Sequence, residues 1–86
     1  MTAGHGFPLA QAGPGEHVEI IALDGGSNVH RRLNDLGLAP GKRVTVVSSH
    51  PGGPMLIALG GSRIGIGFGM ALKVKVRPVV EGDIAE

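Results

Sequence analysis

The clearest periodic pattern lies near the middle of the chain, where apolar residues recur at helical spacing. Val29, Leu33 and Leu36 stand at positions i, i+4 and i+7, with polar residues between them. In an α-helix these three side chains share one face. Ser27 or Asn28 can accept a hydrogen bond from the first free backbone N–H groups and cap the start of the helix. The pattern predicts a short amphipathic helix in which Leu33 and Leu36 have a structural role.

The same segment carries its own stop signal. Gly37 suits the left-handed backbone conformation that commonly follows a helix, and Leu38 can fold back onto Leu33. Pro40 cannot continue the helix, and together with Gly41 it forms a turn that leads into the next element. We therefore assign structural roles to Gly37, Pro40 and Gly41 as well.

Most of the remaining apolar residues lie in short segments separated by Gly and Pro, a pattern typical of antiparallel strands. The predicted strands cover residues 17–23, 43–49, 55–59, 63–68 and 72–78. A tight reversal at Gly60-Gly61 separates the third strand from the fourth. Five strands with one helix after the first predict a mainly β fold, a small antiparallel barrel or sandwich.

Alternation within the strands assigns their side chains to faces. Val18, Ile20 and Ala22 share one face of the first strand. In the fourth strand Gly65 and Gly67 occupy alternate positions, which favours close approach of another backbone or a strong bend. The last strand alternates most regularly, with apolar residues inward and basic residues outward: Leu72, Val74 and Val76 against Lys73, Lys75 and Arg77.

Composition limits the size and class of the protein. The 86 residues form a single domain, with an ordered core at about residues 7–78 and flexible ends at 1–6 and 79–86. Hydrophobic residues make up 42% of the chain, which supports a folded globule. Phe7 and Phe68 are the only aromatic residues, so recognition by stacking on bases or proline rings has almost no side chains to use.

The low net charge and the absence of cysteine argue against several classes of binding and catalytic site. A formal net charge of +1 gives little attraction to nucleic acid or anionic membranes. The absence of cysteine excludes disulfides, thiolate nucleophiles and cysteine-ligated metal sites. The start of the chain lacks a signal-peptide pattern, and no apolar run approaches the roughly 20 residues that span a bilayer. We expect a cytoplasmic protein without a cofactor.

Histidine is the residue type that most readily suggests a metal site in this chain. The chain has four histidines, His5, His17, His30 and His50. No two of them lie four residues apart on a helix, and none has a carboxylate at a spacing familiar from metal sites. Unrelated surface histidines are therefore the preferred interpretation, and a weak metal site at His30 or His50 is the alternative. Neither a Ser–His–acid arrangement nor a carboxylate pair is identifiable, so the sequence predicts no enzyme.

Two groups of basic residues are candidate interaction surfaces. Lys73, Lys75 and Arg77 form a row that is interpreted as a solvated edge, with nucleic-acid binding as the alternative. The second group surrounds the helix and its apolar exit turn. It predicts a partner-binding surface, and the residues assigned to it are Arg31, Arg32, Leu38, Ala39 and Lys42.

Four features in fixed order make the chain resemble the FeoA family. They are a Pro8-Leu9 leader with the turn Pro14-Gly15-Glu16, the helix and stop RLNDLGLAPG at residues 32–41, the strand at 44–47 followed by Gly53-Pro54-Met55, and the closing strand at 71–76. The resemblance covers residues 7–78, and its most specific segment is L-x-x-L-G-L-x-P-G. One departure concerns Gly67 to Met70, where relatives often carry a basic residue and an acidic pair.

The resemblance implies an SH3-like barrel with a helix after the first strand. It also implies a non-enzymatic accessory or regulatory protein of bacterial ferrous iron transport, which binds the membrane transporter FeoB and does not carry iron itself. FeoB has a cytosolic G-protein domain, and either that domain or the membrane part is the expected partner. Similar domains occur at the C-terminus of iron-dependent repressors, so the fold alone does not identify the partner. Self-association through an exposed edge strand is a further possibility.

Overall fold

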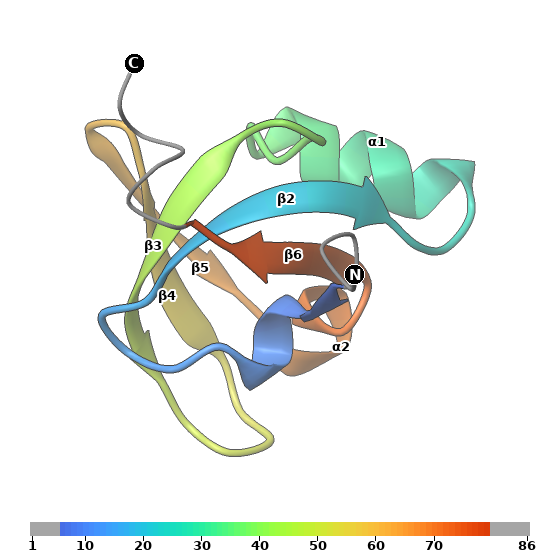
Figure 1. Cartoon of the computed structure of the whole chain (residues 1–86). Helices are drawn as coiled ribbons and strands as arrows, with labels where there is room; N and C mark the ends of the chain where they lie inside the picture. Colours follow the sequence, from blue (N-terminus) through green and yellow to red (C-terminus); the bar gives the residue numbers. More distant parts are fainter. Residues whose placement is uncertain (1–5, 80–86) are drawn as a thin grey trace.

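The computed structural model describes residues 6–79, so most of the predicted flexible ends lie outside the described part of the chain. Its main feature is a six-stranded antiparallel sheet with the order β1-β6-β2-β3-β4-β5 (Figure 1). The sheet does not close, because β1 and β5 lie at its two edges, and it is a barrel only approximately. The elements are β1 (Phe7–Pro8), the 3₁₀ turn η1 (Leu9–Gln11), β2 (His17–Leu23), α1 (Ser27–Asp35), β3 (Arg43–Ser49), β4 (Met55–Leu59), β5 (Ser62–Ile66), α2 (Phe68–Ala71) and β6 (Val74–Pro78).

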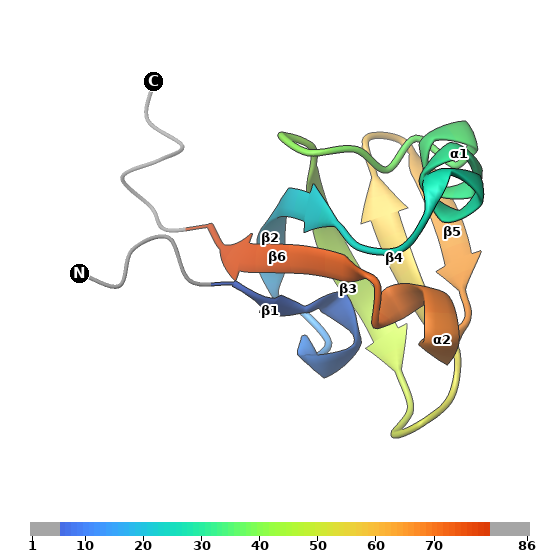
Figure 2. The same ribbon diagram turned by 90° about the vertical axis from the view of Figure 1, so that its right-hand side faces the viewer.

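The predicted mainly β fold with one helix between the first two long strands is confirmed. The bounds of β2, β3 and β4 agree with the alternating segments of the sequence. Their β-branched and aliphatic residues pack well on a pleated, half-buried surface, which explains why the local pattern was sufficient. Figure 2 shows α1 and β5 on one side of the molecule, β1 alongside β6, and the chain passing from α2 into β6.

The C-terminal third differs from the prediction. β5 ends at Ile66, and Phe68–Ala71 form a helical turn instead of the end of a strand. The buried side chain of Ala71 anchors this turn to the core, and the chain re-enters the sheet only at Val74. The prediction that Leu72 points inward is therefore wrong, and its side chain is 41% exposed.

Two further differences concern β1, at one edge of the sheet, and the pairing of β2 with β6. Phe7 and Pro8 pair with Val76 and Lys75, which adds a sixth strand to the five expected. In β2 the pairing with β6 shifts register between Ile20 and Ala22. Such a bulge changes which side chains share a face. Ala22 is exposed, so the prediction that it shares the face of the buried Val18 and Ile20 is wrong.

A single aliphatic core lies between the sheet, α1 and the N-terminal 3₁₀ turn. Among residues 6–79 its members are all apolar, and no polar or charged residue is buried there. The core comprises Leu9, Ala12, Val18, Ile20, Leu33, Leu38, Val44, Val46, Met55, Ile57, Ile66, Ala71, Val74 and Val76. This agrees with a sequence that has only two aromatic residues.

The stop signal after α1 forms as predicted, whereas its start does not. The N–H of Leu38 donates to the carbonyl of Leu33 at 2.9 Å, and the N–H of Gly37 donates to Asn34 at 2.9 Å. This pair of bonds is the Schellman arrangement. At the other end Gly26 is the cap residue and no side chain bonds to the free N–H groups, so the predicted cap by Ser27 or Asn28 is wrong.

We expect the Gly37→Ala substitution to lower the free energy of unfolding by about 1–2 kcal/mol, because Gly37 has a φ of 93°. An added Cβ would also lie 2.9 Å from a terminal carbon of Leu59. Gly13→Ala is the matched control, since a Cβ there meets nothing and its φ is not left-handed. Chemical denaturation of both variants measures the difference, and an equal loss in the two would contradict the role of the left-handed conformation.

Candidate protein-binding site

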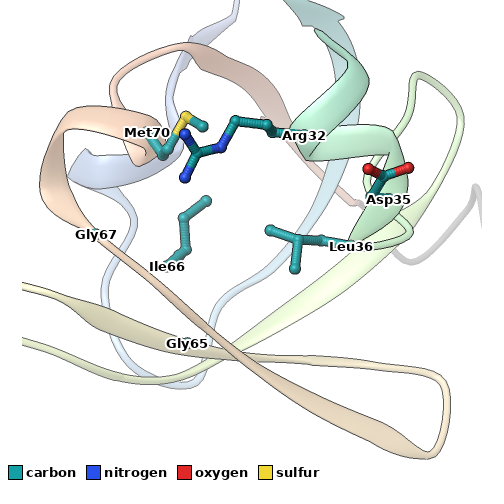
Figure 3. A pocket seen from close by; sticks show the side chains of 7 residues that line it. All are labelled: Arg32, Asp35, Leu36, Gly65, Ile66, Gly67 and Met70. Carbon is teal, nitrogen blue, oxygen red and sulfur yellow. The ribbon is translucent and has the colours of Figure 1, made fainter. Parts of the chain in front are cut away.

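A surface groove lies where α1, β5 and α2 meet, and we call it the α1–β5 groove. It has a volume of about 340 Å³. Figure 3 shows the side chain of Arg32 extending from α1 toward Met70 of α2. The side chains of Ile66 and Leu36 lie between this pair and the strand that carries Gly65. The groove is lined by Arg32, Asp35, Leu36, Gly65, Ile66, Gly67 and Met70.

The apolar character of the groove follows from how α1 ends. Leu33 is fully buried, and Leu36, the residue that caps the helix C-terminus, is 41% exposed. The Schellman bonds turn the chain after Leu36 so that Leu38, and not Leu36, completes the core. The side chain of Leu36 is thereby left on the surface beside Ile66, whose own side chain is buried. The structural role predicted for Leu36 is therefore wrong, because only Leu33 of the pair reaches the core.

The groove also has charged residues at its rim. Arg32 and Asp35 are exposed, and neither forms an ion pair with another residue of the described range 6–79. The ion pairs of that range lie on the β2–β6 side of the sheet, where Glu19 pairs with Arg77 and Arg43. The rim of the groove therefore keeps its charges available for another molecule.

Only part of the predicted partner surface is accessible. Arg31, Arg32 and Lys42 are exposed, and Ala39 is half-buried. Leu38 is fully buried and cannot contact a partner, so its assignment to this surface is wrong. It faces inward because its N–H is bonded to Leu33 and its side chain completes the core.

The far wall of the groove was not predicted from the sequence. Gly65, Ile66, Gly67 and Met70 lie about thirty residues beyond α1 in the chain, and the fold brings them beside Arg32. The signal was present in the alternate glycines. These glycines predicted either close approach of another backbone or a strong bend. Within residues 6–79 a Cβ at Gly65 or Gly67 would meet no atom within 4 Å, and the chain leaves the strand after Ile66 to form α2.

The alternative sites have weaker support in the geometry. In the basic row of β6, Arg77 donates to Glu19 at 2.8 Å and Lys75 lies 3.8 Å from Asp24. These carboxylates offset two of the three positive charges that a nucleic acid would contact.

Within residues 6–79 no three His, Cys, Asp or Glu side chains are close enough to hold a metal ion. His30 has a buried Nε2 atom without a hydrogen-bond partner in that range.

The comparisons with known proteins identify the family. A family model described as "FeoA domain" matches residues 7–78. The chain belongs to the FeoA family. A curated relative named "Putative Fe(2+) transport protein A", from Methanocaldococcus jannaschii, is 36% identical over 76 residues, which are 88% of this chain and 92% of the relative. No described helix of this FeoA-family chain is long and apolar enough to cross a membrane.

Solved structures agree with the fold. The crystal structure of an iron uptake regulatory protein, FeoA, is 40% identical and has a TM-score of 0.83, with 87% of this chain and all of the other covered. A FeoA-like protein from Clostridium acetobutylicum is 23% identical, with a TM-score of 0.78 and coverage of 88% and 90%. A manganese-dependent transcriptional repressor shares the fold at 14% identity and a TM-score of 0.80, over 86% of this chain and 37% of the repressor. The same SH3-like fold therefore occurs in FeoA proteins and in a transcriptional repressor. The similarity to the Clostridium acetobutylicum protein and to the repressor concerns the fold alone.

Proposed function

We propose that this FeoA-family chain is a cytoplasmic accessory protein of ferrous iron transport that regulates a FeoB-like membrane transporter. It binds the transporter through the α1–β5 groove and does not carry iron itself. The observation that supports this most directly is Leu36, a large apolar side chain left 41% exposed beside a groove whose rim charges have no partner in the described range. Apolar groups in a concave site with a few polar residues are typical of binding surfaces.

The proposed binding surface overlaps the surface predicted from the sequence, but its centre lies closer to the C-terminal end of α1. Arg31, Arg32, Ala39 and Lys42 were assigned to it from the sequence, and Arg32 belongs to the groove itself. We retain Arg31, Ala39 and Lys42 as residues at the margin of the contact. The centre of the contact moves to Leu36, where apolar area is available for burial.

The proposal predicts that the chain changes transport through the full-length transporter. Proteoliposomes that contain the transporter would be loaded with a dye that reports ferrous iron, and the initial rate of uptake would be measured with and without this chain. We expect the rate to change, and the change to depend on whether GDP or a non-hydrolysable GTP analogue occupies the transporter. The heat-unfolded chain is the control, and an unchanged rate in both nucleotide states would overturn the proposal.

A further inference from the structure

β5 is a free edge of the sheet that can accept another strand. It pairs with β4 on one side only, through a register that runs from Met55 opposite Ile66 to Leu59 opposite Ser62. The other edge is β1, which has only two residues and offers little for pairing. β5 is therefore the one extended edge in residues 6–79.

The hairpin geometry shows which backbone groups of β5 face outward. The β4–β5 loop has two residues, and the first, Gly60, has a φ of 60°, as in a type II′ turn. In such a hairpin the closing pair, Leu59 and Ser62, is hydrogen-bonded, and pairs alternate from there along the ladder. The N–H and C=O groups of Arg63 and Gly65 consequently point away from β4, toward the open edge.

The glycines next to this edge are not required by the fold. Gly65 and Gly67 do not have the left-handed φ that favours glycine, and a Cβ at either position would meet nothing. Glycine within a strand also destabilises it by about 0.5–1 kcal/mol relative to alanine. The bare backbone instead leaves room above the edge for side chains of another strand.

The α1–β5 groove lies beside the same edge. Gly65 and Ile66 belong both to the strand and to the groove, and Leu36 and Met70 face them from α1 and the α2 turn (Figure 3). Arg32 and Arg63 are exposed cations without an ion pair in the described part of the chain. An added strand would thus meet backbone groups, an apolar depression and two free positive charges.

We infer that an extended segment of the transporter adds to β5 as a seventh strand. Its backbone bonds to the outward groups of Arg63 and Gly65, one apolar side chain enters the groove beside Leu36, and an acidic side chain pairs with Arg32. Backbone bonds of this kind supply affinity, and the pockets for alternate side chains supply specificity. This inference rests on the proposed function and specifies how the partner is held.

Hydrogen exchange at single backbone amides tests the inference directly. The full chain would be measured by NMR alone and with the soluble cytosolic domain of the transporter. We expect exchange of the Arg63 and Gly65 amides to slow by about tenfold or more in the complex. The amide of Ile64, which faces β4, is protected in both states and serves as the internal control.

A pair of substitutions at Gly65 gives a second readout. Gly65→Pro removes the outward N–H and also fixes φ at about −65°, a change that an edge strand tolerates. We expect the dissociation constant to rise about tenfold or more. Gly65→Ala keeps the N–H but adds a Cβ on the surface that the strand would cover, so we expect its dissociation constant to rise less than that of Gly65→Pro. A thermal melt of each variant verifies that it is folded.

The possible outcomes separate the inference from the function on which it rests. Binding without protection of Arg63 and Gly65 would overturn strand addition and leave the regulatory role standing. Protection in the absence of the transporter, with a doubled mass in solution, would assign the edge to a second copy and overturn the choice of partner. An absence of binding by the original chain, both to the cytosolic domain and to the full-length transporter, would overturn both.

Discussion

Replacing Leu33 with alanine is expected to lower the free energy of unfolding by about 3–5 kcal/mol. The side chain lies fully buried in the last turn of α1, and its removal takes away apolar contact area and leaves a cavity. The stability of a domain of this size is only about 5–10 kcal/mol, so the variant would lose a large part of it. Urea denaturation with a common m-value for the two proteins measures this change.

Leu36→Ala is the matched control for that measurement. It deletes the same atoms from the same helix, yet the side chain of Leu36 is 41% exposed, so we expect a loss below about 1 kcal/mol. Equal losses at Leu33 and Leu36 would contradict the orientation of α1 on the sheet. The comparison also separates the structural leucine from the one that we assign to binding.

The second large effect is expected on binding. Leu36→Ser should raise the dissociation constant for the transporter by about tenfold or more, because burial of a leucine side chain contributes about 1.5–3 kcal/mol. Stability should change little, since the side chain lies at the surface in the free protein. Isothermal titration calorimetry with the soluble cytosolic domain of the transporter measures the affinity.

Leu72→Ser provides the control for this variant. Leu72 is exposed to the same extent as Leu36, at 41%, but does not line the α1–β5 groove. Its replacement is expected to leave the affinity unchanged. If the two substitutions weakened binding equally, general surface hydrophobicity would explain the effect and the groove would lose its special role.

Local sequence pattern was sufficient wherever neighbouring residues decide the structure. The helical spacing of Val29 and Leu33 and the stop signal at Gly37 predicted α1 and its end correctly. The alternating segments located β2, β3 and β4 with their observed bounds. These elements are set by side-chain period and by backbone conformations that the residues themselves favour.

The errors occur where tertiary contacts decide. Leu36 and Leu38 are two residues apart, and only the direction of the chain after the Schellman turn determines that Leu38 is buried and Leu36 exposed. Leu72 continued the alternation of the last strand, but the α2 turn removes it from the sheet. In the same way Ala22 follows a register shift that its own neighbours do not encode.

The candidate site was predictable only in part for the same reason. Arg32 was identified from the basic residues around the helix, whereas Gly65 and Met70 join it only through the fold. Their segment was noted for its alternate glycines and for its departure from relatives, but neither signal indicates a groove without knowledge of what lies opposite. The partner and the role of each residue in binding stay predictions until they are measured.

A backbone amide NMR titration with the cytosolic domain of the transporter tests the central claim most directly. The domain would be added in its GDP state and with a GTP analogue, and shifts would be mapped on residues 6–79. We predict that the perturbed amides cluster on the end of α1, on β5 and on the α2 turn, with an affinity that depends on the nucleotide. Shifts confined to the basic row of β6, or none in either state, would contradict the assignment of the α1–β5 groove as the binding site.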